Sequence, residues 1–548
     1  MGWTMFFDKL KKSIFNWNFI VFILILLLAS GIRFYNPIFR SLWGDEVDSL
    51  FRIYNFSLHN FHYEPISIFD RLQLALFNPL KGHHLPAYYL LLGVWTALFG
   101  FGEIAVRSLS VILGILCVPI TYWLARELYD DQTARLSAFL MAISSFAVFY
   151  SQEIRPYALM LFMSTASSLF FWRIFFGKAG LANWIGYFVS SFILILSHIF
   201  GGLAISAQSL YLLFVWFQKQ RRQKIIQLAG AQVLLYILVL LILLPIFISG
   251  IKTMSGMGQD FPFTQIPGIL KLCLNFFVLG FGESLAPWNW LIVIPAGLVY
   301  LYLFGRMLVK WRDPKILFLL TLLLWPNVFS VFLIKLTLPK YLIIVLPVFL
   351  VLIGRAIIEI RSIYVKAIIL LVLIFTQLFS INNYYQIKEY HNANQMEPWR
   401  QVSGNITDQF KPGDVILVNS YDVSFRLLQY YLNVLKKGQY PIFLVNYPGS
   451  PEFISEDGGM PIFISSLKLA NSKYDRIFLI IHLRDDRKTP LGAIASLKQS
   501  LLKTYKLKLQ NKYIPYEETL ISKLPFFKPK NGENRIVIEI YDRIKVKD

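Results

Sequence analysis

Three carboxylates stand within four residues near the start of the chain. The stretch from Arg40 to Leu50, RSLWGDEVDSL, contains Asp45, Glu46 and Asp48 among apolar residues. A carboxylate placed in this way can accept the proton of an attacking hydroxyl group, as a general base does. Three neighbouring acids also allow a divalent cation, because hard cations take oxygen ligands, although no further ligand stands beside them. The apolar flanks argue against a fully solvated loop.

Further ionisable residues lie in or beside apolar segments later in the chain. Ionisable groups close to lipid are costly, so a gathering of them predicts a functional site. Each also has a structural interpretation, as a helix-end side chain that reaches lipid headgroups, as half of an ion pair, or as a polar residue packed between helices. The residues are His84 in GHHLPAYYLL, Arg107 in GFGEIAVRSL, Glu153 and Arg155 in YSQEIRPYAL, His198 in LSHIFGG and Lys340 in IKLTLPKYL.

The composition is typical of a multi-pass membrane protein. Of the 548 residues, 56% are hydrophobic and 16% are charged, and the mean hydropathy is +0.54. The long apolar runs suit helices of about 20 residues, which satisfy their own backbone polar groups inside lipid. The apolar residues do not alternate with polar ones, which excludes a membrane β-barrel. The net charge of +21 comes from short Lys and Arg clusters between apolar segments. Clusters of this kind mark the cytoplasmic side of a membrane protein, and we predict no nucleic-acid partner.

The basic clusters orient the chain, because cytoplasmic loops are enriched in Lys and Arg. The strongest cluster is QKQRRQK, from Gln218 to Lys224. We expect the N-terminus inside the cell, the C-terminus outside, and about eleven transmembrane helices. Residues 84–100 are apolar and aromatic, but a crossing there would place the later basic clusters outside, so a juxtamembrane helix is predicted. The predicted spans are 15–32, 105–125, 135–150, 156–175, 182–198, 201–217, 226–249, 288–305, 316–334, 341–354 and 367–382.

The chain loses its apolar character after Tyr384. We therefore predict a transmembrane module over residues 1–384, whose first outer loop covers about residues 33–104, and an extracytoplasmic soluble α/β domain over residues 385–548. Short apolar runs predict its strands, and one helical pattern lies between them. The predicted strands are Asp414–Val418, Arg476–His482 and Arg535–Tyr541, and the predicted helix is Ser424–Leu435.

This topology places the acids, histidines and cations described above on one side of the membrane. A carboxylate that faces basic groups there suits glycosyl transfer from a lipid phosphate. The carboxylate accepts the proton of the acceptor hydroxyl, and the cations stabilise the departing phosphate. A well-placed general base contributes roughly 10²- to 10⁴-fold in rate.

The same residues carry a family resemblance. WGDE at Trp43 to Glu46, H-x-P at His84 to Pro86, FGEIAVRSLSVILG, YSQEIRPYAL, SHIFGG and PKYLIIVLP occur in this order. The chain thereby resembles the GT-C glycosyltransferases, and within them glycosyltransferase family 39, which includes protein-mannosyltransferase-like and aminoarabinose-transferase-like enzymes. The resemblance runs over about residues 15–390, and EPWRQVSGNI, from Glu397 to Ile406, extends it.

The resemblance implies a multi-pass protein of a bacterial inner or plasma membrane that transfers a hexose or pentose, with inversion, from a polyprenyl-phosphate carrier. The acceptor is a lipid, glycan or protein at the extracytoplasmic face, and no cofactor is implied beyond the divalent cation considered above. Asp45 would be the general base, and Glu46 would orient it or the acceptor. Arg107, Arg155 and Lys340 would bind the donor phosphate, and His84, Glu153, His198 and Asp48 would shape the site.

Two positions depart from the family pattern. The family often has Arg where Lys340 stands and a second proline where Leu85 stands. Lys offers a point charge and no bidentate fork, so the phosphate contact at Lys340 differs from that of an Arg.

Two other classes of protein compete with the transferase. A transporter or flippase of lipid-linked sugars would use the same charges to bind a moving headgroup, but such proteins typically contain paired repeats and broken helices, and the sequence shows neither. A receptor or scaffold would recognise its partner through the outer domain, which leaves the acids of the first outer loop unexplained.

Overall fold

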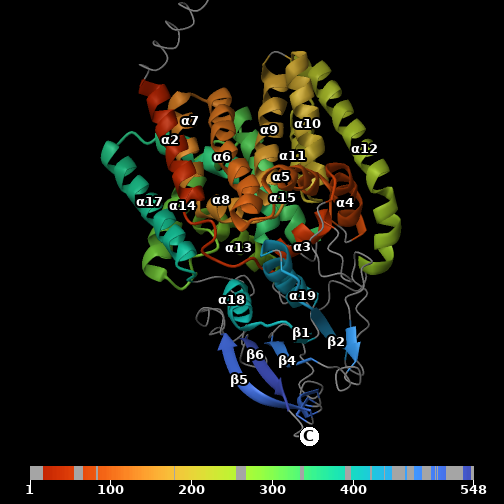
Figure 1. Ribbon diagram of the computed structural model, residues 1–548. Coiled ribbons are helices and arrows are strands. Elements are labelled where there is room, and N and C mark those ends of the chain that lie inside the picture. Colours follow the sequence, from red (N-terminus) through yellow and green to blue (C-terminus); the bar gives the residue numbers. More distant parts are fainter. Residues whose placement is uncertain are drawn as a thin grey trace, which may run out of the picture. The chain divides into compact units, whose positions relative to one another are not determined.

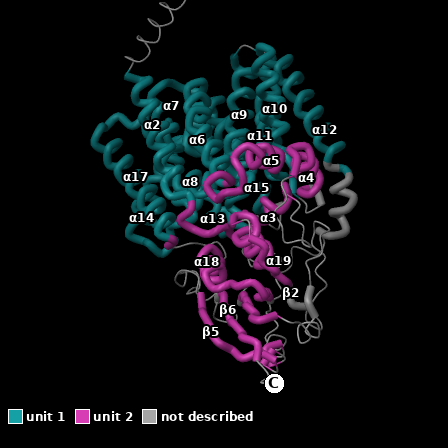
Figure 2. Tube along the Cα trace, in the orientation of Figure 1, with its two compact units in different colours: residues 1–37, 83–88, 107–386 teal, residues 38–82, 89–106, 387–548 magenta. Residues whose placement is uncertain are grey.

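The computed structural model describes the chain in two compact units, which Figure 2 distinguishes by colour. The helical unit comprises residues 1–37, 83–88 and 107–386, and the mixed unit comprises residues 38–82, 89–106 and 387–548. The described residues are 17–54, 66–81, 84–177, 179–254, 267–333, 338–388, 397–419, 422–436, 438–446, 463–465, 474–483, 495, 497–499, 501–502, 504–513 and 535–544.

Most of the helical unit consists of long apolar helices (Figure 1). Within the described residues, eight helices are long and apolar enough to cross a membrane, or up to nine if a bent pair counts as one span. The helices are α2 (Trp17–Phe34), α6 (Glu103–Leu128), α7 (Asp131–Ile143), α8 (Ser145–Ser151), α9 (Tyr157–Phe176), α10 (Leu181–Ser197), α11 (Gly201–Phe214), η1 (Lys219–Arg221), α12 (Arg222–Met254), α13 (Gly268–Phe281), α14 (Trp290–Leu308), α15 (Pro314–Leu333), η3 (Pro339–Val345), α16 (Leu346–Ile358) and α17 (Ile363–Tyr385).

The predicted helical membrane fold is confirmed, since every predicted span falls on a helix or on two consecutive helices. Residues 15, 16 and 334 of those spans lie outside the described residues. Helix α13 was not predicted. Its 14 residues are fewer than a full span needs, and Lys271 interrupts the apolar run, yet this lysine is buried inside the unit. The number of crossings stays a prediction.

Residues 84–100 form the short helix α5 (Ala87–Phe99). It has 13 residues, and at 1.5 Å per residue such a helix is roughly 20 Å long, against a hydrocarbon core of about 30 Å. This length agrees with the predicted juxtamembrane helix, which remains a prediction. Only the first two residues of α5 belong to the helical unit, and the rest belong to the mixed unit.

The span formed by α7 and α8 is broken, which the sequence did not indicate. The two helices meet at an angle of 56°. Arg33 of α2 is buried beside the break and donates to the carbonyl oxygens of Met141, at 3.0 Å, and Ala142, at 2.8 Å. Carbonyl groups at a helix end have no intrahelical donor, and lipid offers none. Arg33 therefore supplies hydrogen bonds to carbonyl groups at the break. The sequence has no Pro or Gly at this position that would have predicted the break.

The mixed unit contains a six-stranded sheet with the strand order β3-β2-β1-β4-β6-β5 (Figure 1). Strands β3, β2, β1 and β4 are parallel, and β6 and β5 continue the sheet in antiparallel pairs. The register pairs Val418 with Leu444 and with Ile480, and Ile480 with Ile538. The strands are β1 (Asp414–Asn419), β2 (Ile442–Asn446), β3 (Phe463–Ser465), β4 (Arg476–Leu483), β5 (Tyr505–Tyr513) and β6 (Arg535–Arg543).

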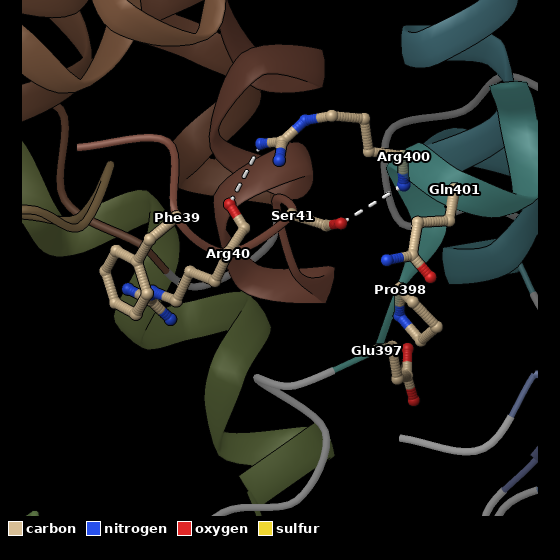
Figure 3. A pocket seen from close by; sticks show the side chains of 7 residues that line it. All are labelled: Phe39, Arg40, Ser41, Glu397, Pro398, Arg400 and Gln401. Carbon is tan, nitrogen blue, oxygen red and sulfur yellow. Dashed lines mark hydrogen bonds between the residues drawn. The ribbon is translucent and has the colours of Figure 1, made fainter. Parts of the chain in front are cut away.

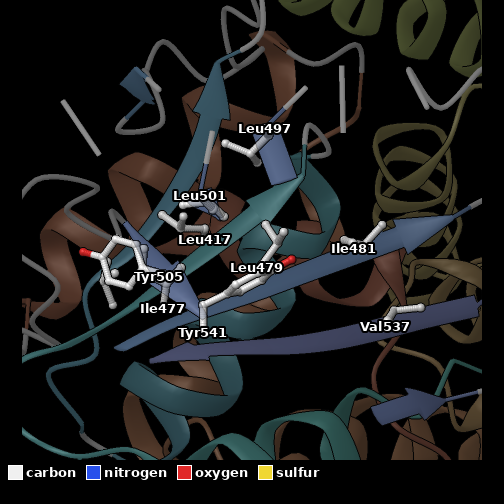
Figure 4. Packing of buried hydrophobic residues seen from close by; sticks show 10 residues of the cluster. Leu417, Ile477, Leu479, Ile481, Leu497, Leu501, Tyr505, Val537 and Tyr541 are labelled. Carbon is white, nitrogen blue, oxygen red and sulfur yellow. The ribbon is translucent and has the colours of Figure 1, made fainter. Parts of the chain in front are cut away.

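One face of the sheet is covered by an apolar core that includes Leu417, Leu479, Val537 and Leu501 (Figure 4). The three predicted strands are present as β1, β4 and β6, because continuous apolar runs suit strands that are buried on both faces. Strand β5, at the sheet edge, was not predicted. Its sequence YKLKLQNKY places lysines between leucines, and most of it is exposed.

The remaining helices of the mixed unit come from both the first outer loop and the C-terminal segment. The predicted helix Ser424–Leu435 is present, but it changes from α-helical to π-helical geometry where α19 meets η5. The predicted domain boundary at residue 385 differs from the compact unit, which adds residues 38–82 and 89–106 to residues 387–548. The helices are α3 (Gly44–Ile53), α4 (Ile68–Lys81), most of α5, α18 (Trp399–Gln409), α19 (Asp422–Leu428) and η5 (Gln429–Leu435).

Candidate functional site

Three of the predicted site residues come together in the helical unit. Arg155 follows α8, His198 occupies the loop between α10 and α11, and Lys340 lies in η3. Burial lowers the pKa of the His198 imidazole to about 3, and the positive charges of Arg155 and Lys340 lower it further. Both cations therefore act on one neutral imidazole. We call Arg155, His198 and Lys340 the cation cluster.

Aromatic rings hold the lysine of the cation cluster. The Lys340 ammonium group lies 5.5 Å from the ring centroid of Tyr157 and 5.8 Å from that of Tyr341. The Tyr341 ring also stacks on the His198 imidazole at a centroid distance of 4.7 Å. A cation beside ring faces keeps its charge while it loses part of its water shell. Lys340 is half-buried.

An acid that the sequence did not single out lies beside this lysine. Glu283, in the segment between α13 and α14, accepts a hydrogen bond of 2.7 Å from the Tyr150 hydroxyl. Burial raises the pKa of Glu283, and the charge of Lys340 opposes that rise. The segment FGESLAPW offered a weak signal, an acid flanked by apolar residues, but α13 in front of it had not been predicted.

Three other predicted residues of this unit, Arg107, Glu153 and His84, are not members of the cation cluster, and each is buried or half-buried. Arg107 of α6 is buried and donates from Nη1 to the carbonyl oxygen of Pro37 at 2.7 Å. This bond fixes the chain where α2 leads into the first outer loop. Glu153 is buried in the turn after α8, and His84 is half-buried just before α5.

The three acids of RSLWGDEVDSL lie on helix α3 in the mixed unit, and the structure separates their surroundings. Glu46 is buried in the first turn and accepts from the backbone N–H of Trp43 at 3.4 Å, as part of a capping box. Asp48 accepts from two arginines, Arg52 at 2.8 Å and Arg426 at 3.0 Å. Asp45 is half-buried in the first turn. Asp45 and Asp48 are thus both half-buried, whereas Glu46 is fully buried.

A small cavity of about 50 Å³ opens in the mixed unit where the first outer loop meets α18 (Figure 3). The backbone N–H of Arg400 donates to the Ser41 hydroxyl at 3.1 Å, and its guanidinium donates to the Arg40 carbonyl oxygen at 3.1 Å. The cavity is large enough for ordered water, because one water molecule needs only about 10–15 Å³ of such volume. It is lined by Phe39, Arg40, Ser41, Glu397, Pro398, Arg400 and Gln401.

The chain is similar to known membrane transferases. Residues 83–247 match a family described as dolichyl-phosphate-mannose-protein mannosyltransferase. The apo structure of ArnT from Cupriavidus metallidurans matches with a TM-score of 0.57 at 12% identity, over 94% of this chain and 97% of that chain. The chain thus has the fold of this transferase, and residues 83–247 match the mannosyltransferase family. No curated protein matches the sequence.

Two further structures with the GT-C fold match as well. ArnT from Cupriavidus metallidurans bound to undecaprenyl phosphate has a TM-score of 0.55 at 12% identity, with the same coverage of 94% and 97%. The oligosaccharyltransferase AglB from Archaeoglobus fulgidus, in complex with an inhibitory peptide and a dolichol-phosphate, has a TM-score of 0.50 at 13% identity, over 90% of this chain and 73% of that chain. The match to ArnT thus extends over nearly the whole chain, the C-terminal sheet domain included.

Metal ions in proteins are held by His, Cys, Asp or Glu side chains that lie close together. Among the residues that the structure describes, no group of three or more of these side chains is arranged to hold a metal ion. A divalent cation near the acids of α3 stays a prediction.

Low pH should destabilise the folded protein through protonation of His198. The pKa of its imidazole is 6.5 in an unfolded chain and about 3 in the folded protein. Between these two pH values the unfolded chain is protonated at this residue and the folded protein is not. The stabilisation at this site is complete above pH 6.5 and is lost as the pH falls toward 3. We expect the melting temperature in detergent to fall less between about pH 7 and about pH 5 in His198→Gln than in the wild type. Equal falls would contradict the assignment.

Proposed function

We propose that this GT-C protein transfers a monosaccharide, a hexose or a pentose, from a polyprenyl-phosphate carrier to an acceptor at the extracytoplasmic membrane face, with inversion at the anomeric carbon. The observation that carries the proposal is the cation cluster, in which the Lys340 ammonium group lies beside the Tyr341 ring that stacks on His198, and the charges of Arg155 and Lys340 both act on that imidazole. A phosphate that departs from a sugar needs such cations, since charge-assisted hydrogen bonds to phosphate are the strong ones. The match to an ArnT structure bound to undecaprenyl phosphate supports a lipid phosphate as the ligand.

Arg155 and Lys340 would bind the phosphate in different ways. Arg155 is largely buried, and its planar guanidinium can donate two parallel hydrogen bonds to phosphate oxygens. Lys340 is more accessible and acts as a point charge beside the Tyr157 and Tyr341 rings. We assign Arg107 a supporting role, because its bond to the Pro37 carbonyl oxygen holds the entry to the first outer loop.

Asp45 would be the general base. Its carboxylate takes the proton of the acceptor hydroxyl, the acceptor oxygen forms a bond to the anomeric carbon, and the bond from that carbon to the phosphate oxygen breaks. The phosphate leaves with the bonding electron pair. Attack on the face opposite the phosphate inverts the configuration.

The acceptor would be a lipid, a glycan or a protein. The AglB structure contains an inhibitory peptide, which concerns that enzyme, and the residues of the present chain favour none of the three classes. The distribution of Lys and Arg clusters supports an outward-facing reaction in a bacterial inner or plasma membrane, with the C-terminal domain outside.

A transporter is the competing function, and the broken span α7–α8 is the observation that favours it. The carbonyl oxygens at this break, however, accept hydrogen bonds from Arg33, so they are engaged within the protein. A test uses purified protein in detergent, where no two compartments exist. The protein is mixed with a radiolabelled polyprenyl-phosphate sugar and an extract of delipidated envelope acceptors. Label that moves from the donor to an acceptor supports the transferase, and binding without any transfer supports a carrier.

A further inference from the structure

Helix α3, which carries Asp45, is bonded to helix α19 of the C-terminal segment. Asp48 of α3 lies between two arginines. Its Oδ2 accepts from Nε of Arg52 at 2.8 Å, and its Oδ1 accepts from Nη1 of Arg426 at 3.0 Å. Arg426 belongs to α19, is 7% exposed, and lies 5.3 Å from the ring centroid of Phe51 on α3. The Arg426 side chain thus binds α3 through both an ion pair and a ring face.

The same two helices pack closely at the first residue of α3. A Cβ atom added to Gly44 would lie 2.9 Å from Cγ1 of Val423 on α19. Real Cβ contacts are essentially never this short, so a side chain at position 44 would force Val423 to shift. Gly44 directly precedes Asp45, so α19 meets α3 next to the proposed base.

A second set of bonds joins the C-terminal segment to the stretches on either side of α3. Arg400 of α18 forms a bidentate ion pair with Glu103, with Nε at 2.9 Å from Oε2 and Nη2 at 3.0 Å from Oε1. The same Nη2 donates to the carbonyl oxygen of Arg40, at 3.1 Å. Bidentate pairs of this kind fix orientation as well as distance. Arg400 therefore ties the residues just before α3 to the far end of the first outer loop.

The π-helical segment η5 extends this second set. The Tyr431 hydroxyl donates to Oε1 of Glu103 and accepts from the backbone N–H of Leu42 at 2.7 Å. The neighbouring Tyr430 hydroxyl donates to the carbonyl oxygen of Phe101 at 2.8 Å. Two consecutive residues thus reach the same loop, which a π-helical turn allows because it rotates side chains away from their α-helical positions.

From these contacts we propose that the C-terminal domain positions the catalytic helix α3, with Arg426 and Asp48 as the principal positioning residues and Arg400, Glu103 and Tyr431 as their support. The proposal rests on the proposed function, in which Asp45 is the general base. Asp48 then acts through α3 and touches no substrate. The tolerance for a base is small, because a misplacement of about 1 Å can lower a rate by about 10²-fold.

The test compares Arg426→Gln with Arg476→Gln in the full-length protein in detergent. Arg476 is the matched control, because it also forms an Arg–Asp ion pair, 2.6 Å to Asp414, inside the sheet of the same unit. We expect Arg426→Gln to lower kcat by about 10- to 100-fold with little change in the donor KM. Arg476→Gln should keep kcat near that of the wild type at a similar loss of melting temperature. Arg426→Lys, which keeps the charge, should recover part of kcat.

Tyr431→Phe is a second variant, which removes only one oxygen atom. It tests the positioning role even if Arg426→Gln fails to fold. It should lower kcat several-fold by the same route. The proposal is overturned if either variant retains wild-type kcat, or if Arg476→Gln loses as much kcat as Arg426→Gln at the same melting temperature. Asp45→Asn is measured in parallel. Full activity of Asp45→Asn would defeat the proposed function, whereas an inactive Asp45→Asn beside a fully active Arg426→Gln would defeat the positioning role alone.

Discussion

Asp45→Asn is expected to lower kcat by about 10²- to 10⁴-fold, while the KM for the donor changes little. The amide is nearly the same size as the carboxylate, so packing around α3 is kept and only the ability to accept a proton is lost. The measurement is the rate of sugar transfer by purified protein at saturating donor, together with the melting temperature of the variant.

The matched control for this substitution is Asp70→Asn on α4. Asp70 lies in the same unit, is exposed, and bonds only locally in its described contacts, to the Ser67 hydroxyl at 2.7 Å. It should retain wild-type transfer. Near-normal turnover by Asp45→Asn would show that another group takes the proton, and the assignment of the base would then be wrong.

Arg155→Gln is expected to lower kcat/KM by about 10²- to 10³-fold, because a preorganised donor to the departing phosphate is removed from a largely dry site. The neutral amide keeps much of the length of the side chain but carries no charge. The same substitution should weaken binding of the sugar-free polyprenyl phosphate, which is measured by displacement of a fluorescent analogue.

Two further variants sharpen this second prediction. Lys340→Arg keeps the positive charge and introduces a fork, so it should retain most of the activity. Arg173→Gln is the matched control, since Arg173 pairs at 2.8 Å with Glu127 and both side chains are partly exposed. It should bind the lipid phosphate like the wild type. If Arg155→Gln also bound it normally, the cation cluster would have no part in donor recognition.

Hydropathy alone was sufficient to predict most of the helical architecture. Lipid offers no hydrogen-bond partners, so each crossing segment must be a long apolar helix. A run of apolar residues in the sequence is therefore enough to predict such a helix. The prediction was incomplete where the local signal conflicts with the packing. Helix α13 contains Lys271, which is buried inside the unit, and the break between α7 and α8 depends on Arg33, more than a hundred residues away.

The candidate site was predicted in part. The ordered motifs indicated Asp45, Arg155, His198 and Lys340, and the structure brings the last three together in one unit. Glu283 accepts a hydrogen bond from Tyr150, and its pKa is influenced by the charge of Lys340. It does not belong to any of the sequence motifs. Neither does Arg426, whose pairing with Asp48 joins positions separated by 378 residues.

Residue types and their spacing determined by themselves that this chain is a multi-pass membrane protein with a C-terminal sheet domain, and which acids and cations the chain contains. Only the tertiary structure decided that Asp48 is also held by Arg426 of the C-terminal segment. The reason is physical. This partner lies 378 residues along the chain from Asp48, and it is brought to α3 only when the distant segment folds against it.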